Sequence, residues 1–340
     1  MLIPDQIQKS NPIQFSTKEI QDSLQKKGIY QKGSFIIKIW LESEENNSQN
    51  MEIPEDDDLM FVIQNNDQKT PFLGVVNYYF KREGYCLNTY LNGDIYYGYY
   101  SSDLRNRQGI YAYTPKKINN EELLYQFYYG TWKNDLINGN GIYLWLKEKI
   151  FPKNKNIFGN FDNANFQAFV GNSNKGFFKK GALLSKEKNN YFVYYGTLSD
   201  EGKREGENCF YYSANLEKLC LGTFKENIFV EGFVGKFNDN GELTDIITYK
   251  KINGKTEGEK IILNKDEKIY KNLSKIRDVL LSKDYFGILY DVFSELIKFR
   301  DEKMNNIDII ISDKYVQIMK SLSTFNNVTL CKDIEQNVEF

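Results

Sequence analysis

Two stretches of this sequence carry residue types and spacings that suggest ligand chemistry. FYYGTWKNDLINGNGIYLW (residues 127–145) sets glycines among aromatic residues. Glycine-rich loops bind phosphates and aromatic rings line ligand pockets, so this stretch is a candidate binding site. Gly-Lys-Thr at 254–256 matches the end of a P-loop, but Tyr249 stands where the first P-loop glycine belongs. Asn253 and Gly254 between two strand-like segments instead predict a tight hairpin turn.

Residues for acid–base, metal or nucleophilic catalysis are missing or badly spaced. The chain has no histidine, which excludes Ser-His-Asp and Cys-His catalysis and every histidine-ligated metal site. Asp56–Asp58 lack the alternate spacing, the glycine and the closing glutamate of an EF-hand loop. Glu44–Glu45 and Glu121–Glu122 are adjacent pairs whose carboxylates do not converge. We therefore expect no enzyme activity, no metal and no cofactor.

Bulk composition indicates a globular protein. The 340 residues are 41% hydrophobic and 26% charged, and the net charge of −2 argues against a protein that chiefly neutralises nucleic-acid phosphates. Cys86, Cys209, Cys220 and Cys331 are widely scattered, as expected for reduced thiols. The first residues do not resemble a signal peptide, and no apolar run approaches the ~20 residues of a membrane span. These features predict a cytoplasmic protein.

The elements that must position any site fall into three predicted segments. Residues 1–70 form an amino-terminal arm with strands at 35–41 and 59–64 and an acidic loop between them. Residues 71–264 alternate aromatic residues, glycines and polar turns, a pattern typical of short strands. Residues 265–340 show helical periodicity, which predicts about three helices. The apolar positions of these helices are Leu273, Ile276, Val279 and Leu280, then Phe286, Leu289, Tyr290, Phe293, Leu296 and Ile297, then Tyr315, Ile318, Met319 and Leu322 after a Ser312 cap.

The stretch at 127–145 is one copy of an internal repeat. Counted from Tyr128, glycines and aromatics occupy positions 3, 5, 12, 14, 16 and 18, and a second copy counted from Tyr96 has the same register, with Arg107 at position 12. A weaker copy starts at Tyr194, and degenerate starts lie at 72–74, 158–161, 220–224 and 233–237. The repeat glycines that we expect to be structural are Gly98, Gly109, Gly130, Gly139, Gly141, Gly196 and Gly206.

This pattern resembles the MORN repeat family, whose unit runs Y-x-G-x-W/F, a polar turn, then G-x-G-x-Y. The resemblance covers about half the chain and implies that each unit is a β-hairpin. It also implies that antiparallel hairpins stack into one single-layer twisted sheet. Strand alternation supports this fold, because it places the aromatic residues of a hairpin on one face. We therefore expect a mainly β protein with a helical carboxy-terminal region.

A face lined by aromatic rings is the predicted functional surface. Tyrosine and tryptophan are favoured at protein interfaces, so we expect these rings to bind a protein partner or to pack within the chain. The residues concerned are Tyr96, Tyr100, Tyr111, Tyr113, Tyr128, Trp132, Tyr143 and Trp145. The resemblance implies a non-enzymatic scaffold, most often a component of cilia or the cytoskeleton, such as a radial spoke of the axoneme.

Two other functions remain open at this stage. Basic residues expected in hairpin turns, namely Arg105, Arg107, Lys203 and Arg204, would make a membrane-contact module if they bound acidic phospholipid. Neighbouring Asp103, Asp135, Asp200 and Glu201 weaken that field. The chain would also serve as an accessory subunit of some other large assembly.

Overall fold

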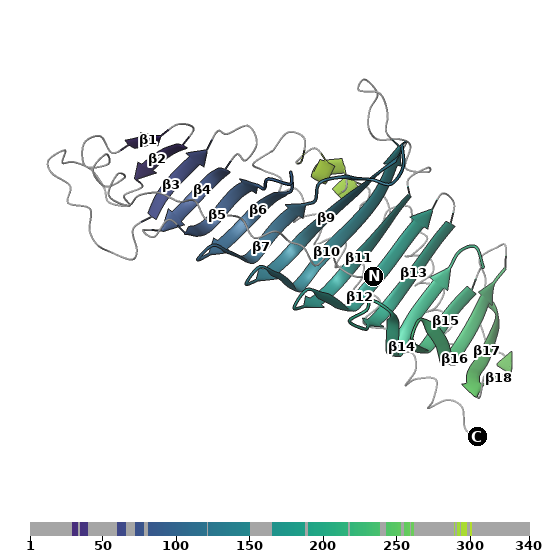
Figure 1. Ribbon diagram of the computed structural model, residues 1–340. Helices are drawn as coiled ribbons and strands as arrows, with labels where there is room; N and C mark the ends of the chain where they lie inside the picture. The colour runs from purple at the N-terminus through teal and green to yellow at the C-terminus, as the bar shows by residue number, and fades with distance from the viewer. Residues whose placement is uncertain are drawn as a thin grey trace. The chain divides into compact units, whose positions relative to one another are not determined.

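The aromatic and glycine-rich half of the chain folds into antiparallel β-strands (Figure 1). The computed structural model describes residues 29–32, 35–39, 60–65, 72–77, 81–120, 122–149, 165–187, 190–216, 218–238, 243–252, 255–258 and 260–261, together with helical positions between 289 and 300. The chain divides into two compact units. The amino-terminal unit is Pro4–Thr114 with Phe127–Gly139, and the carboxy-terminal unit is Met1–Ile3, Pro115–Gln126 and Asn140–Phe340.

The amino-terminal unit contains an open antiparallel sheet in which strands neighbour one another in chain order. From β1 to β7 each strand pairs with the next, and β7 pairs with β9. These strands are β1 (Ile29–Lys32), β2 (Phe35–Ile39), β3 (Met60–Asn65), β4 (Phe72–Asn77), β5 (Arg82–Thr89), β6 (Ile95–Ser101), β7 (Leu104–Ala112) and β9 (Glu122–Lys133). The strands predicted at 35–41 and 59–64 are thus confirmed as β2 and β3. The acidic loop between them lies outside the described residues.

The carboxy-terminal unit repeats the same construction, and β11 to β17 pair in chain order. Its strands are β8 (Lys116–Lys117), β10 (Leu136–Lys149), β11 (Asn165–Asn174), β12 (Phe177–Glu187), β13 (Asn190–Leu198), β14 (Arg204–Ser213), β15 (Lys218–Lys225), β16 (Ile228–Phe237), β17 (Leu243–Ile252), β18 (Lys255–Glu257) and β19 (Lys260–Ile261). Strands β9 and β10 contribute residues to both units. Ile252 of β17 pairs with Lys255 of β18, so the hairpin predicted at Asn253–Gly254 is confirmed.

The mainly β prediction is therefore confirmed, whereas the prediction of three carboxy-terminal helices is not supported, because the described residues hold one short helix. Helical residues are described only between positions 289 and 300, and there Leu289, Val292, Leu296 and Ile297 are buried. These residues include three positions of the apolar face expected for the middle helix. The first and third predicted helices lie outside the described residues. Within the described part of the chain, no helix is long and apolar enough to cross a membrane.

Four hairpins share one tight turn whose two central residues both have positive φ. The pairs are Ser102–Asp103, Asn134–Asp135, Lys175–Gly176 and Glu226–Asn227, with φ between 48° and 88°. Two consecutive positive φ values define the type I′ turn, whose twist matches that of the flanking strands. Asp, Asn or Gly fills the second position each time, as expected for residues that tolerate this conformation.

The Tyr-x-Gly element of the repeat folds one tyrosine ring over the backbone of its own hairpin. The Tyr96 hydroxyl donates to the carbonyl oxygen of Tyr99 at 3.2 Å, and Tyr128 and Tyr194 make the same bond to the residue three positions on. A Cβ on Gly98 would lie 2.5 Å from the Tyr96 hydroxyl, and one on Gly109 would lie 2.4 Å from it. Glycine is therefore required there because the ring occupies the space of a side chain.

Small residues continue this arrangement across the strands of each unit. In the amino-terminal unit the cross-strand register aligns Gly74, Cys86, Gly98, Gly109 and Gly130, one residue from each of five strands. In the carboxy-terminal unit Gly171, Gly181 and Gly196 align in the same way. Position 12 of the repeat has a different requirement, because Gly139, Gly206 and Arg107 all have positive φ there. Gly141 is buried in β10.

Candidate interaction surface

The eight aromatic residues predicted to bind a partner are all buried. Their exposed fractions lie between 0% for Tyr96, Tyr111 and Tyr143 and 8% for Trp145. The Tyr96 ring packs edge-on against Tyr100 at 5.1 Å and against Trp132 at 5.6 Å between ring centroids. In the carboxy-terminal unit Tyr143 stacks on Trp145 at 4.3 Å. These rings form the core of their units, so a contact surface for a partner must be sought elsewhere.

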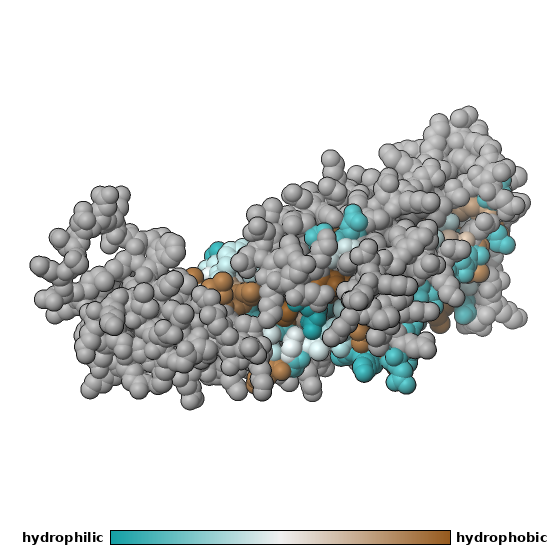
Figure 2. Space-filling view, turned by 90° about the horizontal axis from the view of Figure 1, so that it is seen from above, coloured by the Kyte–Doolittle hydropathy of each residue, from teal (hydrophilic) through white to brown (hydrophobic). Residues whose placement is uncertain are grey.

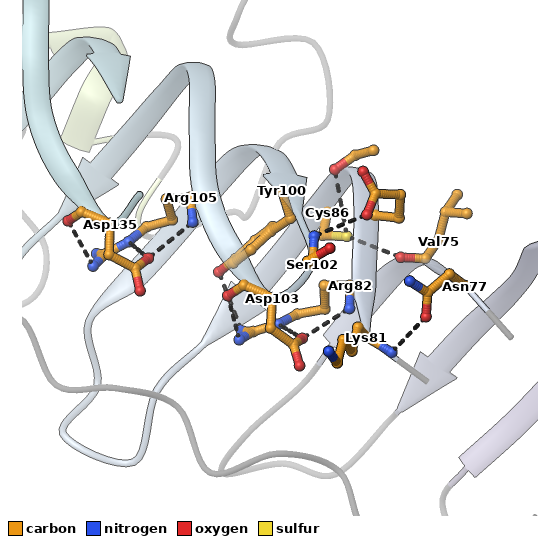
Figure 3. A network of polar contacts seen from close by, with 12 residues as sticks. Val75, Asn77, Lys81, Arg82, Cys86, Tyr100, Ser102, Asp103, Arg105 and Asp135 are labelled. Atoms are coloured by element: carbon orange, nitrogen blue, oxygen red, sulfur yellow. Dashed lines mark hydrogen bonds and ion pairs between the residues drawn. The ribbon is translucent and has the colours of Figure 1, made fainter. Parts of the chain in front are cut away.

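A buried arginine clasps the turn of the following hairpin (Figure 3). In the amino-terminal unit the Arg105 backbone N–H and Nε both donate to Oδ1 of Asp135, at 2.8 and 2.9 Å, and Nη2 donates to the Asp135 carbonyl oxygen. Arg82 makes the same set of bonds to Asp103 of the hairpin before. In the carboxy-terminal unit Arg204 binds Asn227 in this manner. The clasp is thus a repeated device that joins consecutive hairpins.

The surroundings of Arg105 explain how a guanidinium is tolerated in the core. Its carbon Cζ lies 4.5 Å from the ring centroid of Trp132 and 5.2 Å from that of Tyr111. The buried Nη1 has no hydrogen-bond partner among the described residues, and the nearby rings give the guanidinium cation–π contacts. Burial lowers the pKa of Arg105, but Tyr90 and Asp135 raise it by more, so the net pKa shift is upward. Arg105 therefore remains a cation within an aromatic shell.

The four basic residues considered for lipid contact do not form one exposed cationic patch. Arg105 is 2% exposed and bound to Asp135, so the prediction that it contacts lipid is wrong. Lys203 pairs with Glu201 at 2.6 Å and Glu226 at 2.5 Å, and these carboxylates raise its pKa. Arg204 is bound to Asn227 in the turn of the following hairpin. Arg107 alone is exposed with no ion pair among the described residues.

Sequence reasoning overlooked a second set of tyrosines on the opposite face of the amino-terminal sheet. In YYGYY (96–100), Tyr97 and Tyr99 alternate with buried Tyr96 and Tyr100 and are partly exposed, while Tyr85 on β5 is 49% exposed. The signal that could have found them is strand parity, since neighbouring residues of a strand face opposite sides. We call the set on this side the open tyrosine face. It comprises Leu73, Tyr85, Leu87, Tyr97, Tyr99 and Arg107.

Side chains of the open tyrosine face contact one another across neighbouring strands. The Tyr85 ring lies 5.6 Å from that of Tyr99, edge to face, and 6.3 Å from that of Tyr97. The Arg107 guanidinium covers the Tyr99 ring at 4.3 Å from its centroid. Arg107 reaches this side because its positive φ of 51° places it in a bulge of β7. Leu73 is 40% exposed and pairs with Leu87 in register, which adds aliphatic area beside the rings.

Large apolar residues are also exposed just after the tight turns. Leu104 and Leu136 occupy this position in the amino-terminal unit, at 38% and 46% exposure. Phe177 and Ile228 occupy it in the carboxy-terminal unit, at 38% and 50%. Figure 2 shows hydrophobic side chains that reach the surface among hydrophilic ones. Exposed apolar residues at one repeat position mark a second surface with the composition of a contact site.

Cys86 and Cys220 do not offer reactive thiolates. Cys86, Cys209 and Cys220 are buried and unpaired as disulfides. Burial raises the pKa of Cys86 to about 12 and that of Cys220 to about 11. A thiol with such a pKa stays protonated at neutral pH. Among the described residues, no group of three or more Cys, Asp or Glu side chains is placed to hold a metal ion.

No protein-family model matches the chain, and no curated protein matches it.

Proposed function

We propose that this chain is a non-enzymatic scaffold that binds a protein partner through the open tyrosine face. The observation that carries the proposal is the half-exposed Tyr85, in contact with Tyr97 and Tyr99 and close to Arg107, which has no ion pair among the described residues. Tyrosine and arginine are enriched among the residues that dominate interface energies. Tyrosine also offers a large contact area with little loss of side-chain entropy.

The buried face supports this role by holding the open face rigid. Glycines opposite Tyr96 fix the ring, and the clasps of Arg82 and Arg105 fix consecutive turns. Binding to a surface that is already ordered costs less conformational entropy. A sheet whose packed face lies opposite a partly exposed patch of tyrosines therefore suits a scaffold.

The resemblance to MORN repeats leads us to propose a setting for this scaffold. Simple MORN-repeat proteins occur in cilia and the cytoskeleton, so the proposed partner is a component of the axoneme, as in a radial spoke, or of another cytoskeletal assembly. An accessory subunit of a different large complex is the alternative. This step is an analogy between repeats and is independent of the contacts described above.

Proximity labelling in the native cell tests the proposal. Tyr85→Ala combined with Arg107→Glu should remove a set of neighbours that the wild-type chain labels, and those neighbours should be cytoskeletal proteins. Lys117→Glu, another charge change at an exposed position, is the matched control and should leave the neighbours unchanged. An identical neighbour list for wild type and the double variant would overturn the proposed surface. Neighbours from another compartment would overturn the setting.

Membrane contact is a second candidate, supported by the exposed apolar residues after the turns. Leu104 and Leu136 carry the apolar area, and Lys133 is exposed in the same hairpin as Leu136. Apolar side chains beside lysines are the composition of surfaces that lie on acidic membranes. Co-sedimentation with vesicles that contain phosphatidylserine should then depend on both leucines and weaken with salt. Equal sedimentation of wild type and Leu104→Glu with Leu136→Glu would exclude this route.

A further inference from the structure

We propose that the open tyrosine face binds a proline-rich segment in the polyproline II conformation, with a carboxylate three residues from a proline. This inference rests on the proposed function, because it names the chemistry of the partner at the same surface. Its elements are the exposed Tyr85, the neighbouring Tyr97 and Tyr99, and the cation of Arg107.

The backbone of this region excludes recognition by strand addition. Strand β5 pairs with β4 and β6, β6 pairs with β5 and β7, and β7 pairs with β6 and β9. Every one of these strands has both edges occupied. A partner on this face must therefore be bound by side chains. Of the common modes of peptide recognition, pairing with a free strand edge does not apply here.

The composition of the face matches the surfaces that bind polyproline II helices. Such helices dock between exposed aromatic rings, because their conformation is preformed and loses little entropy on binding. Here Tyr85 is 49% exposed, and its ring stands edge to face against Tyr99 and beside Tyr97. Leu73 on β4 and Leu87 on β5 extend the apolar area. A prolyl ring is an apolar group that can pack on the exposed Tyr85 ring.

Arg107 supplies the charge that selects the ligand. Its guanidinium lies over Tyr99, and no described carboxylate pairs with it. The nearest acidic residue on the same side of β5, Glu83, accepts a hydrogen bond from the Ser102 backbone N–H at 2.8 Å. The surface thus has a cation on β7 and an anion on β5, and the complementary ligand places its carboxylate over β7.

The spacing of the two anchors sets the register of the motif. Tyr99 separates them, with its ring 5.6 Å from the Tyr85 ring and 4.3 Å from the Arg107 guanidinium. Tyr85 and Arg107 lie on strands two positions apart, which corresponds to about 9.6 Å across a sheet. One turn of a polyproline II helix has three residues and advances about 9.3 Å. A proline over Tyr85 therefore places the residue three positions along the ligand at Arg107, which gives the motif Pro-x-x-Glu or Pro-x-x-Asp.

Fluorescence anisotropy with the full chain and labelled synthetic peptides tests the motif. The probe is a peptide of repeated Pro-x-x-Glu units, compared with peptides that replace glutamate by lysine or shift it by one residue. We expect the first peptide to bind at least roughly tenfold more tightly than either control, since tenfold corresponds to the loss of a single good ionic contact. Tyr85→Ala should abolish the preference. Arg107→Glu should reverse it, so that the lysine peptide binds better.

Several results would overturn the inference. Equal binding of the three peptides, or an affinity unchanged by Tyr85→Ala, would show that the face does not read this motif. Tighter binding of an oligouridine than of any peptide, lost on Tyr85→Ala, would assign the rings to single-stranded nucleic acid instead. The absence of peptide binding, combined with neighbours lost from the Tyr85→Ala and Arg107→Glu chain in cells, would refute the motif and leave the scaffold proposal standing. Lys117→Glu should match wild type throughout.

Discussion

The two faces of the amino-terminal sheet use the same residue types for opposite purposes. On the buried face Tyr96 and Trp132 surround Arg105, which is bound to Asp135. On the open face Tyr85 and Tyr99 adjoin Arg107, which has no ion pair among the described residues. The two sets lie on opposite sides of the strands. The comparison teaches that residue type does not distinguish core from contact surface in this repeat. The side of the strand and the position across the sheet both matter, since Ile110 and Tyr129 lie in cross-strand register with Tyr97 and are buried.

The largest expected difference between the faces is in stability. Trp132→Ala should lower the free energy of unfolding by about 3–5 kcal/mol, because it empties the centre of the ring cluster. Tyr85→Ala, the matched change on the open face, should cost less than about 1 kcal/mol. Urea unfolding of both variants measures the contrast. Similar losses would mean that the open face is also packed.

Arginine replacement should give the next largest contrast. Arg105→Met removes the guanidinium bonds of the clasp and leaves Asp135, whose side chain is 24% exposed, with the backbone N–H of residue 105 as the remaining donor of the clasp. We expect a loss of about 2–3 kcal/mol, below the value for a fully buried pair, because water can reach the freed carboxylate. Arg107→Met should change stability by less than about 0.5 kcal/mol. The same unfolding experiment checks both, and a costly Arg107→Met would show that its cation is structural.

Glycine replacement probes the ring that covers the small-residue row. Gly109→Ala should destabilise by about 1–3 kcal/mol, since its Cβ would meet the Tyr96 hydroxyl at 2.4 Å. Gly109 does not have positive φ, so this cost comes from crowding rather than from backbone strain. Thermal unfolding gives the measurement. An unchanged midpoint would mean that the Tyr96 ring has room to move.

Alkaline pH should lower the stability of the protein, because its buried face contains tyrosine hydroxyls. Burial raises the pKa of Tyr96 and of Tyr100 well above the ordinary value of 10.0. A raised folded-state pKa contributes stability that is complete below the unfolded-state pKa and is lost as pH rises toward the folded-state pKa. The free energy of unfolding should therefore fall above about pH 10. Denaturant titrations on either side of that pH check the sign, and a rise in stability would contradict burial of these phenols.

Much of the fold could be predicted from sequence, because each copy of the repeat has the same steric and backbone requirements. Glycine beside Tyr96 and positive φ at Gly139 or Arg107 follow from spacing that is visible in the chain. Which of these side chains are covered was not predictable, because alternation separates two faces without saying what packs on them. The eight rings proposed to bind a partner are buried, which is the packing alternative that the sequence also left open. The role of Arg105 could not be predicted either, because its partner Asp135 is 30 positions away in the sequence.

Tyrosine nitration of the folded chain, located by peptide mass spectrometry, tests the separation of the two faces most directly. The YYGYY stretch serves as its own control, because open and buried rings alternate within five residues. We predict fast modification of Tyr85 and measurable modification of Tyr97 and Tyr99, while Tyr96, Tyr100 and Tyr111 stay protected until the protein unfolds. Modification of Tyr96 or Tyr111 in the folded chain at the rate of Tyr85 would contradict the account.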